Sequence, residues 1–313
     1  MDSIEQVLAK YNKPLFILLF ALCLFPFISP AVALFLGLAL GMTAGQPFPK
    51  FSKKTSKYLL QFSVVGLGFG MNLHESLKTG KEGMLFTIVS VVAVMVLGIY
   101  LGKRLIMDRK TAYLISAGTA ICGGSAIAAV GPVVKANDNE MSMALGTIFI
   151  LNAIALFIFP PIGHLLGMTQ EQFGMWAAIA IHDTSSVVGA GAAYGEQALE
   201  IATMVKLTRA LWIIPITIVT MFLFQQKGAK ISIPWFIFFF ILAMVANTFL
   251  TIPETITASL VWLAKKGLTV TLFLIGAGLS RKVIKQVGVR PMVQGVVLWI
   301  FIGLISLGVI LLV

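Results

Sequence analysis

The residues with the clearest chemical potential lie in two short polar stretches that interrupt long apolar segments. The stretch 120–128 contains Gly123, Gly124 and Ser125, and the stretch 180–188 contains the run His-Asp-Thr-Ser-Ser from 182 to 186. Hydrocarbon cannot satisfy a free backbone N–H or C=O, so a membrane helix breaks only where protein or a water-filled cavity repairs the loss. Many secondary transporters build their substrate site from such broken helices. The two stretches therefore predict the binding machinery of a transporter.

The first stretch offers a backbone break followed by a helix start. Gly123 and Gly124 remove side chains where the chain must leave helical geometry. Ser125 follows them as a residue able to cap a second half-helix that runs to about Lys135. The alternative is that a run of small residues only permits tight helix packing, and the sequence leaves both interpretations open.

The second stretch is more polar than packing alone requires. Asp183, Thr184, Ser185 and Ser186 are all good capping residues, and a half-helix is expected from about Ser186 towards Tyr194. A helix N-terminus presents unsatisfied N–H groups and a partial positive charge, which favours an anion. Two half-helix N-termini that converge near mid-membrane would form a site for a small oxyanion.

Ionisable residues at membrane depth add a second kind of chemistry. His182 and Asp183 form the adjacent ionisable pair deepest in an apolar run, where such groups usually face a cavity, a partner or a proton path. His182 could carry a coupling proton or bond a freed carbonyl, and Asp183 could carry a proton or cap the half-helix. Arg209 could pair with Asp183 or bind an anion bidentately, whereas snorkelling to the interface suits Lys206 better. Asn152 is expected to form a helix–helix hydrogen bond.

The elements that must position these residues are membrane helices. Of the 313 residues, 58% are hydrophobic and only 11% are charged, against about 25% charged residues in soluble proteins. The predicted class is an all-α integral membrane protein that forms one domain over residues 1–313. Eleven apolar runs approach the roughly 20 residues that cross a bilayer. They cover residues 14–28, 30–45, 58–73, 83–102, 111–135, 142–166, 172–195, 203–224, 233–252, 264–280 and 291–313.

Basic residues are unequally divided between the two sides of this arrangement. The net charge of +11 lies in short clusters between apolar runs, which is typical of membrane topology rather than of a nucleic-acid-binding face. Sixteen Lys and Arg residues fall at the N-terminus and in every second connection after it, against five on the other side. Those five are Lys78, Lys81, Lys135, Lys265 and Lys266. The count predicts a cytoplasmic N-terminus, and eleven spans then place Val313 outside.

A glycine motif recurs near the two ends of the chain. Residues 68–72, with Gly80, match residues 276–280, with Gly288, at a fixed offset. In the predicted topology the two copies run in opposite directions, which is typical of an inverted repeat with elements near 58–102 and 264–313. Chance recurrence of Gly-x-Gly in glycine-rich helices is the alternative.

The broken segments 111–135 and 172–195 also resemble each other. If both of them span the membrane, the one helix between them makes them parallel, whereas an inverted repeat requires antiparallel partners. Either they are not repeat partners or one of them is re-entrant. The sequence leaves this question open.

At these residues the chain resembles a known family. The runs SAGTAICGGSAIAAVGPVVKA and IHDTSSVVGAGAAYG, with the segments GFGMNL and GAGLS, are similar to the YeiH-type membrane proteins, which are often called sulfate exporters. The similarity extends from about residue 30 to the end of the chain. It implies a carrier in the bacterial inner membrane for sulfate or a related sulfur oxyanion. It also implies a fold like that of the bile-acid symporters and sodium/proton antiporters, which use crossed broken helices and inverted repeats.

These patterns together predict a secondary transporter of a small anion, with no cofactor and no enzymatic activity. The residues expected to bind the anion are Gly123, Gly124, Ser125, Thr184, Ser185, Ser186 and Arg209, and those expected to carry the coupling ion or proton are His182 and Asp183. The alternatives are an anion channel and a sodium- or proton-coupled organic-anion symporter with Na⁺ at the C-terminal ends of the first half-helices. The sequence contains no GxxxxGK[ST] loop and no HExxH motif. Assembly into a homo-oligomer stays open.

Overall fold

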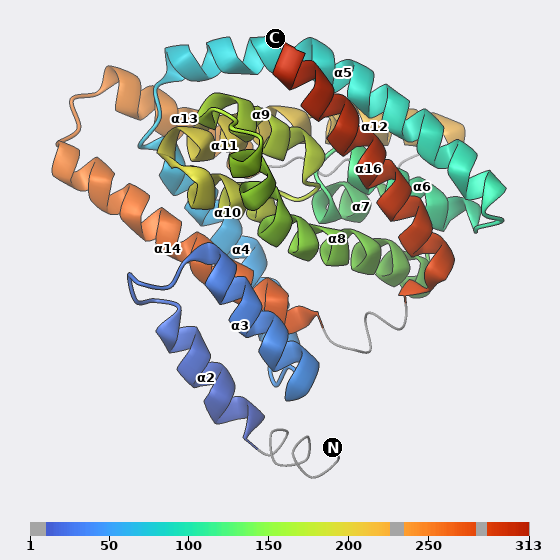
Figure 1. The fold of residues 1–313 in the computed structure, drawn as a ribbon, viewed down its shortest axis with the longest axis horizontal. Coiled ribbons are helices and arrows are strands. Elements are labelled where there is room, and N and C mark those ends of the chain that lie inside the picture. Colours follow the sequence, from blue (N-terminus) through green and yellow to red (C-terminus); the bar gives the residue numbers. More distant parts are fainter. Residues whose placement is uncertain (1–10, 226–234, 280–286, 313) are drawn as a thin grey trace.

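The computed structural model describes residues 11–225, 235–279 and 287–312, apart from the side chains of residues 75 and 77–85. Within these residues all regular structure is helical, which confirms the predicted all-α class. Figure 1 shows the helices α2 (Asn12–Leu22), α3 (Pro30–Thr43), α4 (Pro49–Gly68), α5 (Leu73–Arg104), α6 (Arg109–Ala120), α7 (Gly124–Val130), α8 (Asp138–Leu165), α9 (Gln170–Ala180), α10 (Thr184–Tyr194), α11 (Glu196–Ala210), α12 (Ile213–Leu223), α13 (Trp235–Phe249), α14 (Glu254–Gly278) and α16 (Val289–Leu312).

Side-chain caps set the starts of the helices that build the centre of the molecule. Asp108 precedes α6 and its carboxylate accepts hydrogen bonds from the first backbone N–H groups of that helix. Reciprocal capping boxes start α8, through Asn137 and Glu140, and α9, through Thr169 and Gln172. These local signals fix where each central segment enters the helical bundle.

The helices form two packed groups. Helices α2, α3, α4, α13 and α14 pack on one side, and helices α5 to α12 with α16 pack on the other (Figure 1). The first group has a small apolar core of its own between α2, α3 and α14. Helices α3 and α14 touch through backbone, because a Cβ added at Gly276 would lie 2.9 Å from the backbone nitrogen of Leu38. Such glycine contacts are a common way to join membrane helices.

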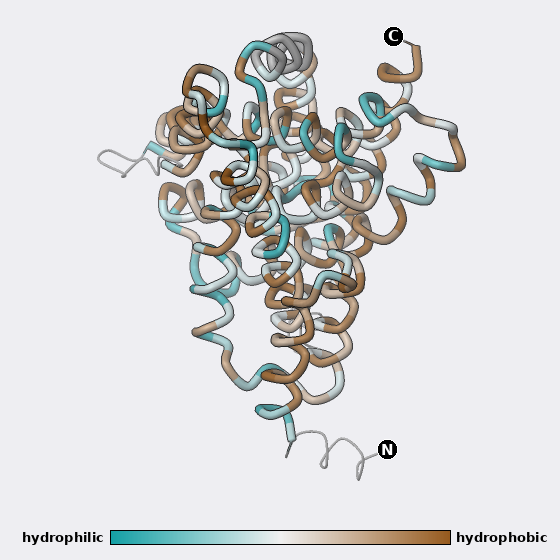
Figure 2. The backbone as a smooth tube through the Cα atoms, turned by 90° about the vertical axis from the view of Figure 1, so that its left-hand side faces the viewer, coloured by the Kyte–Doolittle hydropathy of each residue, from teal (hydrophilic) through white to brown (hydrophobic). Residues whose placement is uncertain are grey.

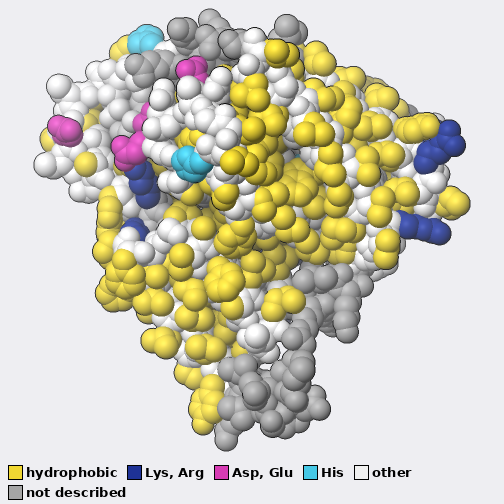
Figure 3. Space-filling view, in the orientation of Figure 1, with side chains coloured by type: hydrophobic (Ala, Val, Ile, Leu, Met, Phe, Trp, Pro, Cys, Tyr) yellow, Lys and Arg dark blue, Asp and Glu magenta, His cyan; other side chains and the backbone are white. Residues whose placement is uncertain are grey.

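The surface and helix lengths agree with a membrane protein. In the described residues five helical segments are long and apolar enough to cross a bilayer, namely Phe86–Arg104, Asp138–Leu165, Glu196–Leu223, Glu254–Gly278 and Val289–Leu312. Figure 2 shows hydrophobic residues along much of the backbone, with hydrophilic residues in shorter stretches. In Figure 3 a broad hydrophobic face lies between Lys and Arg side chains at the right edge and the carboxylates on the left, which have further Lys or Arg side chains beside them.

The first broken segment is a re-entrant hairpin. Helix α6 ends at Ala120, and α7 returns alongside it, so that a Cβ added at Gly118 would lie 2.9 Å from the side chain of Ile127. At the base of the hairpin, the ammonium of Lys110 donates to the carbonyl of Lys135 over 2.8 Å. The half-helix predicted to reach about Lys135 therefore ends at Val130, and the segment leaves the bundle at the end where it entered.

The second broken segment is also a re-entrant hairpin. The hydroxyl of Tyr194, at the end of α10, donates to the carbonyl of Met168, just before α9, over 2.6 Å. The Tyr194 ring stacks on Phe173 of α9 at 3.8 Å between ring centroids. The chain thus returns to the end of the bundle where α9 begins, before α11 starts at Glu196.

The two hairpins enter from opposite ends of the bundle, and their tips meet. Helix α8 has 28 residues between them, which is about 42 Å of helix and enough to carry the chain across a bilayer. A Cβ added at Gly123 in the first tip would lie 3.0 Å from the Cβ of Asp183 in the second. The two segments therefore enter the bundle in opposite directions, and each turns back to the end from which it came. The count of eleven spans is wrong for 111–135 and 172–195 for the same reason.

Helices α11 and α12 then pass both tips and return to the end where α6 begins. There the hydroxyl groups of Tyr113 and Thr220 are 2.7 Å apart, and the Arg109 guanidinium lies over the Phe224 ring. We call this end, which also holds Lys103 and Lys110, the basic end. Lys135 lies at the basic end, so its predicted place on the other side is wrong.

Helices α4 and α14 are antiparallel, as the recurring glycine motif predicts. The Cβ positions of Gly66 and Gly70 approach Ala264 and Val261 respectively, so residue numbers rise along one helix as they fall along the other. The inverted repeat as such stays a prediction. Several residues used in the sequence argument lie outside the described residues, namely Lys10, Lys227, Lys230, Ser280, Arg281, Lys282, Lys285 and Val313. The side chains of Lys78 and Lys81 are also outside them.

The hairpin at 111–135 can be tested by one-sided labelling. In a background with Cys23 and Cys122 replaced by Ser, we expect Lys135→Cys to react with a membrane-impermeant maleimide from the same side as Lys103→Cys. Glu196→Cys, at the opposite end, is expected to react only from the other side. Labelling of Lys135→Cys from the Glu196 side would show that the segment spans the membrane.

The close contact between Gly123 and Asp183 at the two hairpin tips leads to a second prediction. Gly123 has φ +65°, and a side chain there would be strained and would press on Asp183. Gly123→Ala should therefore destabilise the protein by about 1–3 kcal/mol, seen as a lower melting temperature. Gly308→Ala is the matched control, because a Cβ at that helical position meets nothing within 4 Å. Equal melting temperatures for the two variants would contradict the crossing.

Candidate functional site

The N-terminal end of α10 is built by an acidic cap. The Asp183 carboxylate accepts the backbone N–H of Ser186 over 2.6 Å and the hydroxyl of Ser185 over 3.2 Å. Asp183 and the three residues that follow it are buried, and the helix begins at Thr184, two residues earlier than expected. The structure thus contains the capping role that the sequence offered for Asp183. This cap holds the first turn of α10 against the tip of the other hairpin.

Asn152 of α8 repairs the backbone at the same break. Its side-chain oxygen accepts the N–H groups of His182 over 3.0 Å and Asp183 over 3.3 Å. The Asn152 amide nitrogen is buried and has no hydrogen-bond partner among the described residues. Sequence reasoning expected a helix–helix hydrogen bond here and missed the role at the break. The only signal was an isolated Asn in a long apolar run, which does not say what the amide faces.

Lys206 is buried at the C-terminal end of α9. Its side chain is fully buried, and its ammonium donates to the carbonyls of Ile181 over 2.7 Å and Ala178 over 3.2 Å. These carbonyls belong to the last turn of α9 and the residue beyond it, where no helical N–H follows to bond them. The snorkelling interpretation of Lys206 is therefore wrong, because the side chain points into the protein at the hairpin tip.

Arg209 occupies the equivalent position at the end of α6. Its side chain is fully buried, and its Nε donates to the carbonyl of Ala120 over 2.8 Å. The two terminal guanidinium nitrogens have no partner among the described residues. Of the two roles that the sequence left open for Arg209, the ion pair with Asp183 is absent there, since the ion pair in the described part of the chain joins Lys265 and Glu196. The guanidinium thus keeps its fork free.

Further polar atoms at the tips are also unpartnered. His182 is fully buried, and neither of its ring nitrogens has a hydrogen-bond partner in the described parts of the chain. The hydroxyl of Thr119, one residue before the end of α6, is in the same state. Buried polar groups are normally bonded to protein or water. Several such groups near one crossing indicate a place that a polar ligand or ordered water completes.

The charges at the crossing do not balance. Lys206 and Arg209 place two basic side chains in the protein interior at the crossing, and Asp183 is the carboxylate named among the described residues there. A buried charge without a partner is strongly unfavourable. The arrangement therefore favours a bound anion. Within the described residues no three His, Cys, Asp or Glu side chains are grouped as a metal site requires.

The first tip contributes backbone rather than side chains. Gly123 is the N-cap of α7 and makes no side-chain cap, and Gly124 is the first residue of that helix. Ser125 lies within α7 and is exposed, so its predicted role as the cap is wrong. The physical reason is the positive φ at Gly123, which turns the chain earlier than expected. Ser125 therefore lies outside the buried cluster around Arg209.

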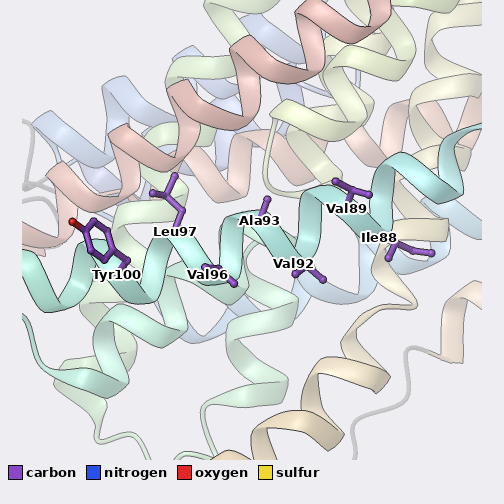
Figure 4. A pocket seen from close by; sticks show the side chains of 7 residues that line it. All are labelled: Ile88, Val89, Val92, Ala93, Val96, Leu97 and Tyr100. Carbon is purple, nitrogen blue, oxygen red and sulfur yellow. The ribbon is translucent and has the colours of Figure 1, made fainter.

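Two hollows lie away from the crossing. One is an apolar hollow of about 670 Å³ on α5. Figure 4 shows the side chains that line it, namely Ile88, Val89, Val92, Ala93, Val96, Leu97 and Tyr100. A second cleft, of about 360 Å³, lies between α4, α11 and α14 at the end opposite the basic end. Glu196, Glu200 and Lys265 line it, and it reaches Thr203, one turn before Lys206. The second cleft thus approaches the hairpin tips along α11.

Comparison with known proteins gives a consistent result. The chain matches the family described as "Conserved hypothetical protein 698" over residues 15–295. A UPF0324 membrane protein of Bacteroides thetaiotaomicron is 65% identical over 283 residues, which cover 90% of this chain and 86% of that relative. Those of Porphyromonas gingivalis and Photobacterium profundum are 58% and 48% identical, covering 91% and 96% of this chain and 88% and 92% of those relatives.

No solved structure matches the chain. The family match covers most of the sequence, and the relatives align over nearly their full lengths. The chain therefore belongs to the family of Conserved hypothetical protein 698, which confirms the YeiH-type resemblance carried by its motifs.

Proposed function

We propose that the protein is a secondary transporter that binds a small anion where the tips of its two re-entrant hairpins meet. The guanidinium of Arg209 carries this proposal, because it is fully buried and two of its nitrogens have no partner in the described residues. A buried cation with free donors is unfavourable unless an anion or water completes it. The planar fork of Arg also matches the oxygens of an oxyanion better than any other side chain does.

The surroundings of Arg209 support an anion of small size. Helix α10 has 11 residues and presents its N-terminus at the crossing, which adds partial positive charge. Thr184, Ser185 and Ser186 form its first turn and are buried there. His182 and Asp183 are the residues that we propose to carry a coupling proton. Gly123 supplies backbone that comes close to Asp183, the cap of this turn, and we propose that Gly124, the next residue, also faces the anion.

The substrate that we propose is sulfate or a related sulfur oxyanion. Family membership supports this choice, since the YeiH-type proteins are described as sulfate exporters. A tetrahedral oxyanion can accept two hydrogen bonds from the free side of Arg209 and further bonds from hydroxyl groups of α10. The chain is proposed to carry out transport and no enzymatic reaction.

The two helix groups and the opposed hairpins support alternating access. In transporters of this kind a site at mid-membrane stays in place while one bundle rocks against the other. Here the hairpins and α11 would form the moving bundle, and α3, α4 and α14 the fixed one. The cleft lined by Glu196 and Lys265 is the proposed path from one end. We place the basic end on the cytoplasmic side of a bacterial inner membrane, because cytoplasmic loops of membrane proteins carry an excess of Lys and Arg.

Anion binding can be measured on the purified protein. With sulfate, sulfite, thiosulfate, methanesulfonate or chloride at equal ionic strength, we expect one oxyanion to raise the melting temperature saturably. Arg209→Lys should weaken that binding about 10- to 100-fold, because charged hydrogen bonds worth about 1.5–3 kcal/mol are lost. Arg290→Lys is the matched control, since Arg290 also donates to a backbone carbonyl but is exposed at the basic end.

Two results would contradict the anion site. One is that none of these anions stabilises the folded protein. The other is that Arg209→Lys and Arg290→Lys bind the anion as tightly as the unmodified protein does. Proteoliposomes then separate a carrier from a channel, because uptake of the anion should saturate for a carrier and should be far faster and unsaturated for a channel.

A further inference from the structure

The C-terminal ends of both first half-helices carry a protein cation. At the end of α9 the ammonium of Lys206 bonds the carbonyls of Ala178 and Ile181. At the end of α6 the guanidinium of Arg209 bonds the carbonyl of Ala120. The last carbonyls of a helix are unsatisfied and carry partial negative charge, so they attract cations. The same chemistry is thus present at both hairpin tips.

In transporters with broken helices, these carbonyl ends and the unwound backbone next to them are where a coupling Na⁺ binds. A sodium ion there needs several oxygen ligands at short distance. In this protein the two carbonyls at the end of α9 lie 2.7 and 3.2 Å from one nitrogen of the protein itself. The ammonium and a sodium ion would therefore compete for the same carbonyls, and the covalently attached group has the advantage of being always present.

We propose that Lys206 occupies, as a tethered cation, a monovalent-cation site at the end of α9, so that this protein binds its anion without sodium. The claim that the anion binds without sodium rests on the anion-binding function proposed above. The claim that Lys206 fills a cation site rests only on the contacts of Lys206. The proposal excludes the sodium-coupled symporter that the sequence left open. It leaves His182 and Asp183 as the coupling groups at the crossing.

The simpler role for Lys206 would be a structural lysine that only ties α11 to α9. The two roles differ in what happens when the side chain is shortened. A structural lysine leaves a gap that no ion repairs. A tethered cation leaves carbonyls that a small free cation can bond in its place. Rescue by an added cation therefore separates the two roles.

The test compares three variants by thermal unfolding in chloride salts of sodium, potassium, methylammonium and N-methylglucamine at equal ionic strength. The unmodified protein should melt at the same temperature in all four salts. Lys206→Ala should melt lower in N-methylglucamine, and at least one of the three small cations should raise its melting temperature saturably. Lys206→Met, which fills the space without charge, should show no such rise. Lys110→Ala is the matched control, because the ammonium of Lys110 also donates to a backbone carbonyl, that of Lys135, over 2.8 Å at the base of the first hairpin.

Three outcomes would overturn the proposal. Lys206→Ala could fold and respond to none of the small cations. It could fail to fold in any of these salts while Lys206→Met folds. The unmodified protein could also bind its anion at least 10-fold more tightly in sodium than in N-methylglucamine. If no anion binds at all, the anion-binding function fails, whereas the response of Lys206→Ala still decides whether the cation site exists.

Discussion

The structure depends on how two broken backbones are satisfied in a medium that offers no hydrogen bonds. At each hairpin tip the chain stops being helical, and the freed groups find partners on other helices. Asn152 bonds the N–H groups beyond α9, Lys206 bonds the carbonyls before the break, and Arg209 bonds the end of α6. Three polar side chains from α8 and α11 thus supply the hydrogen bonds that the backbone lacks at the two hairpin tips, and their remaining donors form the candidate site.

The polar character of this centre could be read from the sequence. A run such as His182 to Ser186 in an apolar segment has few explanations in a membrane, and the cap at Asp183 follows from residue type alone. The all-helical class and the antiparallel course of α4 and α14 could also be predicted from the sequence, because they follow from the lengths of the apolar runs and the positions of the charge clusters. These features depend on local composition, which a single sequence reports well.

The reversal of the two broken segments could not be read in the same way. A re-entrant hairpin and a spanning broken helix have the same length and the same apolar content. The difference lies in contacts between residues that are far apart in the segment, such as Lys110 with Lys135 and Tyr194 with Met168. The targets of Lys206 and Asn152 were hidden for the same reason, because a side chain's type does not say which backbone it will face.

The bond between Arg209 and Ala120 also constrains the order in which the chain can mature. The two residues are 89 positions apart, so the first hairpin is synthesised and delivered to the membrane well before its partner exists. Until α11 arrives, the carbonyl of Ala120 must be covered by water or by the insertion machinery. The hairpin at 111–135 therefore belongs to an early-synthesised segment, and its last backbone hydrogen bond forms only once α11 has been made.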